Sequence, residues 1–172
     1  MTMKRGRSFA AALSVAALAT VATDDAGIFI TGLAGAAAFV FGKGTWIRHI
    51  LVMAWAMTTI EALLGATKDA VVFSLAMVDM VIAGAALIRW LQDDSRTDAR
   101  IIGGISIMLM PAHFVMSASQ GAVPWWLYAS ICNAAFVLQC LIIGGWLDHV
   151  GRSTGRFVAR LNPVHLFRRG GR

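Results

Sequence analysis

The chain has 172 residues, of which 58% are hydrophobic and 14% are charged. A soluble domain has roughly 45–50% apolar and about 25% charged residues, so the composition excludes a disordered chain, a disulfide scaffold and an ordinary soluble enzyme. The formal net charge is +6, which would suggest nucleic acid in a soluble protein. With a mean hydropathy of +0.71, an integral membrane protein is predicted instead.

A helix that crosses a bilayer needs about 20 mostly apolar residues. Six stretches approach that length, namely 8–22, 26–42, 49–66, 70–91, 101–117 and 122–147. The pattern predicts an all-α fold, a polytopic integral membrane helix bundle with five or six transmembrane helices in residues 1–147. Asp24 and Asp25 separate the first two stretches. Two carboxylates at a bilayer centre would be very costly, so this pair predicts a turn at a membrane surface.

Residues 1–22 allow two interpretations. Three basic residues precede a 15-residue apolar stretch that contains Ala17-Leu18-Ala19, which is the layout of a secretory signal peptide. If residues 1–19 were removed, five helices would remain. If they are retained, the stretch is the first transmembrane helix, because a multispanning protein needs no cleaved signal.

The basic residues predict an orientation. When the N-terminus is placed in the cytoplasm and six helices alternate in direction, every Lys and Arg except Lys68 falls on the cytoplasmic side. This asymmetry predicts a cytoplasmic C-terminus. The bias toward Arg, Ala and Gly suggests a bacterial or phage coding sequence, and hence the bacterial inner membrane. Trp125, Trp126 and Tyr128 follow Pro124 and are expected at the outer membrane interface, where such amphipathic rings are enriched.

Four polar residues within the apolar stretches are candidate functional residues: Glu61, Asp79, His113 and Asn133. Ionisable groups are expensive in lipid and typically mark ion or proton pathways. Counting about 1.5 Å per residue from the helix ends places Glu61 and His113 at similar depths, and Asp79 and Asn133 near the midplane. We therefore expect Glu61 to meet His113, and Asp79 to be buried against the last helix near Asn133. The alternative is polar packing without a further role.

Metal and cofactor chemistry is not predicted. Met53 and Met57 have an MxxxM spacing, and thioether, thiol and imidazole ligands suit Cu(I), but no His or Met cluster lies in the external loops. A haem between His49 and His113 would join opposite membrane faces. Cys132 and Cys140 are eight residues apart on one predicted helix, about 12 Å, which is too far for a disulfide. We expect them to be buried small side chains.

Residues 148–172 differ from the bundle and are predicted to form a basic amphipathic cytoplasmic tail. The candidate lipid-surface residues in this tail are Arg152, Arg156, Arg160, Arg168 and Arg169. The first three repeat every four residues, so they form one helical stripe. Such a stripe next to a membrane span is typical of a helix lying on anionic lipid. The tail has no element that would read nucleic acid.

The predicted protein is therefore a small inner-membrane protein without catalytic chemistry of its own. Its small size and basic tail favour an oligomeric pore-forming or membrane-remodelling protein, similar in role to a holin. An ion- or proton-coupled transporter or channel using Glu61, Asp79 and His113 is the first alternative. A structural subunit that docks on another membrane protein is the second. The expected partners are the bilayer, anionic lipids, and a second copy or another membrane protein.

Overall fold

The computed structural model describes residues 2–23, 25–41, 47–93 and 97–147. Its helices are α1 (Thr2–Thr23), α2 (Ala26–Phe41), α3 (Arg48–Leu63), α4 (Lys68–Gln92), α5 (Thr97–Ala118) and α6 (Trp125–Gly144). No strand occurs in these four ranges. The predicted all-α helix bundle is confirmed, and each of the six predicted stretches overlaps one helix. The predicted tail and its arginines lie outside the described residues.

Local sequence signals set several helix ends. Gly65 adopts a left-handed conformation after α3, at φ +66°, which glycine reaches without a steric cost. The Thr67 hydroxyl then accepts a hydrogen bond from the Ala70 N–H at the start of α4, a standard N-cap. Gly145, at φ +73°, ends α6. The Gly145 N–H donates to the Ile142 carbonyl, and the Trp146 N–H donates to the Leu141 carbonyl. This pair of hydrogen bonds is that of a Schellman motif.

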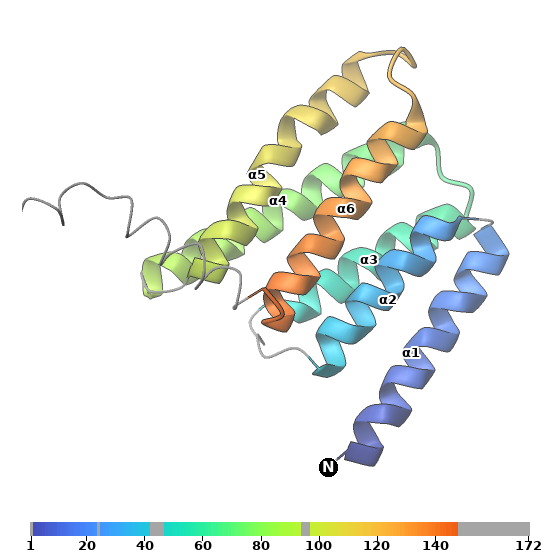
Figure 1. Ribbon diagram of the computed structural model, residues 1–172. Helices are drawn as coiled ribbons and strands as arrows, with labels where there is room; N and C mark the ends of the chain where they lie inside the picture. The colour runs from blue at the N-terminus through green and yellow to red at the C-terminus, as the bar shows by residue number, and fades with distance from the viewer. Residues whose placement is uncertain (1, 24, 42–46, 94–96, 148–172) are drawn as a thin grey trace, which may run out of the picture.

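The helices run alternately up and down (Figure 1). Helices α2 to α6 form a closed ring, because each contacts the next and α6 returns to α2, while α1 lies outside the ring against α2 and α3. We name the two ends of the bundle by residues. The Lys68 end holds the connections 64–67 and 119–124, and the Arg48 end holds the start of α3 and the ends of α4 and α6.

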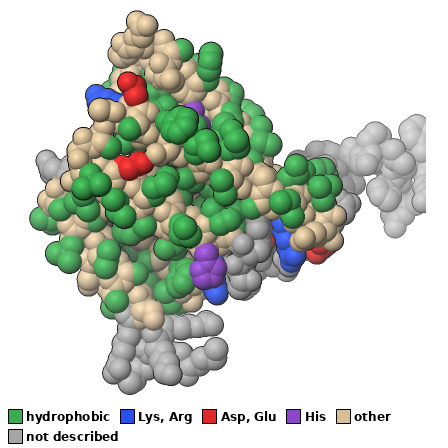
Figure 2. Space-filling model, turned by 180° about the vertical axis from the view of Figure 1, so that it is seen from behind, with side chains coloured by type: hydrophobic (Ala, Val, Ile, Leu, Met, Phe, Trp, Pro, Cys, Tyr) green, Lys and Arg blue, Asp and Glu red, His purple; other side chains and the backbone are tan. Residues whose placement is uncertain are grey.

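Three of the described helices are long and apolar enough to cross a membrane: α4, α5 and α6. The apolar parts of α1 (Ser8–Ala22) and α2 are shorter. Large apolar side chains are exposed on the outward faces, including Phe73, Met108 and Phe114, and Figure 2 shows hydrophobic side chains distributed across one face between tan backbone and other side chains. A lipid environment accounts for this surface, which would be an aggregation liability in water. These features indicate a membrane protein.

Buried apolar residues form two clusters. The larger cluster closes the ring toward the Arg48 end and consists of Ala38, Ile47, Leu51, Ile82, Ile102, Cys140 and Ile143. The smaller cluster, nearer the Lys68 end, contains Val72, Tyr128 and Cys132. Between lipid-exposed helices there is no strong hydrophobic driving force, so close packing of small residues matters more. On α5, a Cβ added at Gly103 would lie 3.0 Å from the Ala86 Cβ of α4.

Candidate functional site

Asp79 is the centre of a buried polar cluster. It lies on α4, is 6% exposed and packs against α5. The prediction that its side chain is buried is therefore confirmed. Its Oδ1 accepts a hydrogen bond from the Ser106 hydroxyl at 2.7 Å. Its Oδ2 lies 2.9 Å from His113 Nε2. Each oxygen therefore has its own partner on α5, which offsets much of the cost of burying a carboxylate.

His113 links this carboxylate to α6. Its second ring nitrogen, Nδ1, lies 2.7 Å from the Tyr128 hydroxyl, and the two rings meet edge to face with centroids 5.8 Å apart. Both residues are almost fully buried, at 3% and 2% exposure. The imidazole thus has a hydrogen-bond partner on each side, which fixes its orientation between α4 and α6.

Ser106 extends the cluster in the other direction. Its hydroxyl accepts a hydrogen bond from Gln139 Nε2 at 2.9 Å. With a neutral imidazole, every hydrogen can point toward the carboxylate, from Gln139 through Ser106 and from Tyr128 through His113. We call these five residues, Tyr128, His113, Asp79, Ser106 and Gln139, the polar chain. It joins α4, α5 and α6 through four hydrogen bonds.

Helix geometry explains why these side chains meet. Ser106 and His113 are seven residues apart, about two turns, so they lie on one face of α5. Asp79 is opposite the gap between them. One turn further toward the Arg48 end, the contact between Gly103 and Ala86 brings the two helix backbones close. This close approach lets short side chains such as serine and aspartate hydrogen-bond across the interface.

A cavity of about 290 Å³ lies inside the ring. Side chains of all five ring helices line it, including Asp79, Tyr128 and Gln139 of the polar chain. At the Lys68 end its wall contains Asp25, Ala66 and Lys68, which are exposed. At the other extreme it reaches Ile82, a member of the apolar cluster that closes the ring. The cavity therefore extends from the Lys68 end to that cluster.

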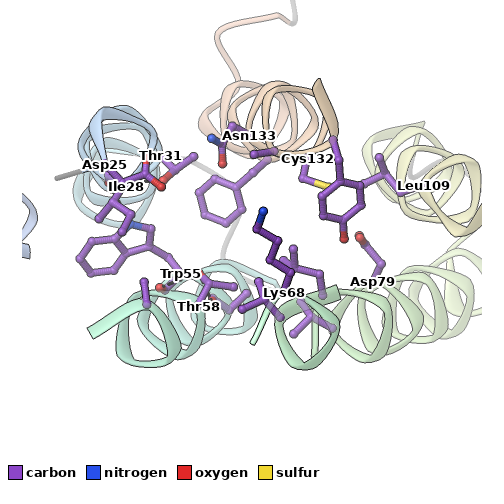
Figure 3. A pocket seen from close by; sticks show the side chains of 18 of the residues that line it. Asp25, Ile28, Thr31, Trp55, Thr58, Lys68, Asp79, Leu109, Cys132 and Asn133 are labelled. Atoms are coloured by element: carbon purple, nitrogen blue, oxygen red, sulfur yellow. Dashed lines mark hydrogen bonds between the residues drawn. The ribbon is translucent and has the colours of Figure 1, made fainter. Parts of the chain in front are cut away.

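The cavity contains both aromatic walls and polar groups. Figure 3 shows Lys68 reaching from α4 into the middle of the ring, with Asn133 of α6 and Asp79 of α4 facing the same space. The Lys68 Nζ lies 5.8 Å from the centroid of the Trp125 ring, within the range of a cation–π contact. The Trp55 indole N–H is already bonded to the Ile28 carbonyl. Trp55 therefore presents an apolar ring surface to the cavity.

Two predicted partnerships are wrong. Glu61 does not pair with His113, because Asp79 and Tyr128 occupy both ring nitrogens. Glu61 instead accepts a hydrogen bond from the Ser74 hydroxyl across the interface of α3 and α4. Its other oxygen is buried without a hydrogen bond, and its side chain is not among those lining the cavity.

Asp79 does not bond to Asn133 either. Both line the cavity, but the carboxylate turns to α5 rather than α6. Tyr128, which is predicted to lie at the outer membrane interface, is buried in the polar chain. Its neighbour Trp126 is exposed.

The sequence interpretation did not select Tyr128, Ser106 or Gln139 as candidate site residues. Two signals were available. The seven-residue spacing between Ser106 and His113 places both residues on one face of α5, and the eleven-residue spacing between Tyr128 and Gln139, about three turns, places both on one face of α6. About 16 Å of helix separates them, and the extended cluster on α4 and α5 bridges that distance.

Cys132 and Cys140 are both buried and free, as expected. Among the described residues, no group of three or more His, Cys, Asp or Glu side chains could hold a metal ion. No family model, curated protein or solved structure matches the chain.

Proposed function

We propose that the chain is a small proton-coupled transporter or channel of the bacterial inner membrane, with no catalytic chemistry of its own. The observation that carries the proposal is the polar chain at the wall of a cavity. Intramembrane Asp and His residues commonly form proton relays. Here they are hydrogen-bonded to each other, and Tyr128 connects them directly to the cavity.

The hydrogen bonds provide a physical route for coupling. With a neutral imidazole, the Tyr128 hydroxyl donates to His113 Nδ1. When His113 gains a proton, both ring nitrogens become donors, so the Tyr128 hydroxyl must accept and turn its own hydrogen elsewhere. Tyr128 also lines the cavity. Protonation of His113 thus changes the hydrogen-bonding character of the cavity wall.

The orientation follows from charge. The positive-inside rule favours a cytoplasmic Arg48 end, which places Lys68 and the opening of the cavity on the outer side. The basic tail would then lie against the inner leaflet. A role as an oligomeric pore would not require a buried, fully hydrogen-bonded chain beside a cavity within one subunit, so the geometry favours transport over the pore.

The test uses the full chain in liposomes that contain a pH-sensitive dye. A potassium diffusion potential drives protons inward, with no solute or with benzoate, benzylamine or alanine outside. Proton uptake above that of empty liposomes supports the proposal if Asp79→Asn abolishes it and Ser117→Ala does not. Asp79→Glu should restore part of it, which separates loss of the carboxylate from a failure to fold.

Two outcomes would overturn the proposal. The first is uptake no faster than in empty liposomes under every condition. The second is rapid release of trapped calcein, which would indicate a non-selective pore instead.

A further inference from the structure

We infer that the cavity binds a small organic carboxylate together with a proton. This inference rests on the proposed function and names the class of solute. It depends on three properties of the cavity: the charge at its opening, the apolar character of its walls, and the hydrogen-bond state of its polar chain.

The charge at the opening favours an anion. Among the described residues that line the cavity, Lys68 is the only Lys or Arg, and Figure 3 shows it directed into the cavity. Among the described residues it forms no ion pair, and its ammonium lies instead near the Trp125 ring. An ammonium in this position can bind a carboxylate through a charge-assisted hydrogen bond.

The carboxylates of the cavity are less suited to a cation. Both oxygens of Asp79 already accept hydrogen bonds, from Ser106 and His113. One carboxylate oxygen of Asp25, Oδ1, already accepts a hydrogen bond from the Gly27 N–H at 2.7 Å. A cationic solute would also meet Lys68 at the opening.

The walls favour an apolar body. Trp55, Trp125 and Phe136 present rings to the space, and aliphatic side chains fill much of the remaining surface. The half-buried amide of Asn133 adds a polar group beside them. Small-molecule sites are typically apolar pockets with a few placed polar groups. At about 290 Å³, this cavity suits a ring-sized monocarboxylate such as benzoate.

The polar chain explains why a proton should accompany the anion. A proton taken up from cavity water resides on His113 Nδ1 and releases the Tyr128 O–H to donate into the cavity. That O–H then becomes a donor for the carboxylate, so each ligand favours the other. Binding one anion and one proton leaves the net charge of the site unchanged, which avoids adding net charge to a low-dielectric region.

The groups around His113 are few. Asp79 of α4 and Tyr128 of α6 contact it directly, and Cys132 of α6 packs against Tyr128. Lys68 and Asp25 are the charged residues farther along the cavity wall. Of these groups, only His113 contacts both the Asp79 carboxylate and the Tyr128 hydroxyl.

The test measures binding of benzoate to the purified full chain by titration calorimetry, with benzylamine as the cationic probe. We expect saturable binding of benzoate that tightens as the pH falls from about 8 to about 5.5, and no binding of benzylamine. Lys68→Gln should weaken benzoate binding at least about tenfold. Lys68→Arg should retain it, and Asp69→Asn, a neighbouring charge outside the cavity, serves as the matched control. Tyr128→Phe should remove the pH dependence.

Three outcomes would overturn this inference. Benzylamine binds more tightly than benzoate, benzoate binds wild type and Lys68→Gln with equal affinity, or benzoate does not bind. These failures are distinct from failure of the proposed function. If benzoate does not bind but potential-driven proton uptake still depends on Asp79, the transport proposal stands and only the solute class is wrong. If octanoate binds and benzoate does not, the proposal of a ring-sized solute is wrong, and the cavity instead holds a lipid-like chain.

Discussion

The polar chain makes Ser106 a structural residue whose removal has a measurable cost. Its hydroxyl is fully buried and joins Asp79 to Gln139. Ser106→Ala would leave both partners with one hydrogen bond fewer in a low-dielectric site. We expect a loss of about 0.5–2 kcal/mol of stability, seen as a lower thermal unfolding midpoint in detergent.

Ser117→Ala is the matched control, because it changes the same residue type on an exposed face of α5. Its midpoint should match that of wild type. Equal shifts for the two variants would contradict a structural role for the buried hydroxyl.

At the residue scale, the sequence identified Asp79 and His113 as candidates but paired them wrongly. Counting along each helix put the two residues at depths that differ by about 7 Å, so they were assigned to different partners. A histidine side chain spans much of that offset, which a count of backbone positions ignores. Glu61 matched the depth of His113, but depth does not specify whether two helices are neighbours.

At the element scale, the helix positions followed from the sequence because polar and turn-forming residues interrupt each apolar stretch. Asp25, Gly65 and Pro124 all lie within a few residues of a helix end. The helix neighbours did not follow, because the apolar surface of a membrane helix faces lipid as readily as protein. Small residues determine these contacts, and their partners are visible only in three dimensions.

The interface of α4 and α5 should be sensitive to the size of residue 103. A Cβ at this position would approach the Ala86 Cβ to 3.0 Å, so Gly103→Val should push the helices apart and strain the bonds of Asp79. We expect an overpacking cost of about 1–3 kcal/mol, measured as a lower thermal midpoint. Gly104→Val is the control, since its position has open space around it. A larger effect at position 104 would refute the packing argument.

Helix α1 is expected to remain in the mature protein rather than to be removed as a signal peptide. Ala16 is 0% exposed and packs closely on α2. A Cβ added at Gly32 of α2 would lie 2.7 Å from the Ala16 Cβ. Loss of α1 would expose this contact. The intact mass of the protein purified from membranes should include residues 1–19. A mass corresponding to cleavage near Ala19 would show that the ring of α2 to α6 is the mature fold.

At the scale of the whole molecule, the cavity could not be predicted from the sequence. Its lining residues are drawn from five helices, and the sequence does not specify which helices are neighbours or how far apart their faces lie. Lys68 was recognised only as the one basic residue on the outer side. In the structure, the same residue is directed into the cavity (Figure 3). The one basic residue that the positive-inside rule places on the outer side is therefore also the candidate binding residue.

The orientation of the molecule determines which compartment the cavity faces, and it can be tested directly. A cysteine placed at Gln120, in the exposed connection between α5 and α6, should react with a membrane-impermeant maleimide added to intact bacterial cells. A cysteine at Gln92, at the other end of α4, should react only after the membrane is permeabilised. The native Cys132 and Cys140 are buried, so the background should be low, and the unmodified chain measures it. Among the described residues, Arg48, Arg89 and Arg100 lie at the Arg48 end, and positive charge there resists translocation. Labelling of Gln92→Cys but not Gln120→Cys in intact cells would contradict this orientation. It would mean that the opening of the cavity faces the cytoplasm.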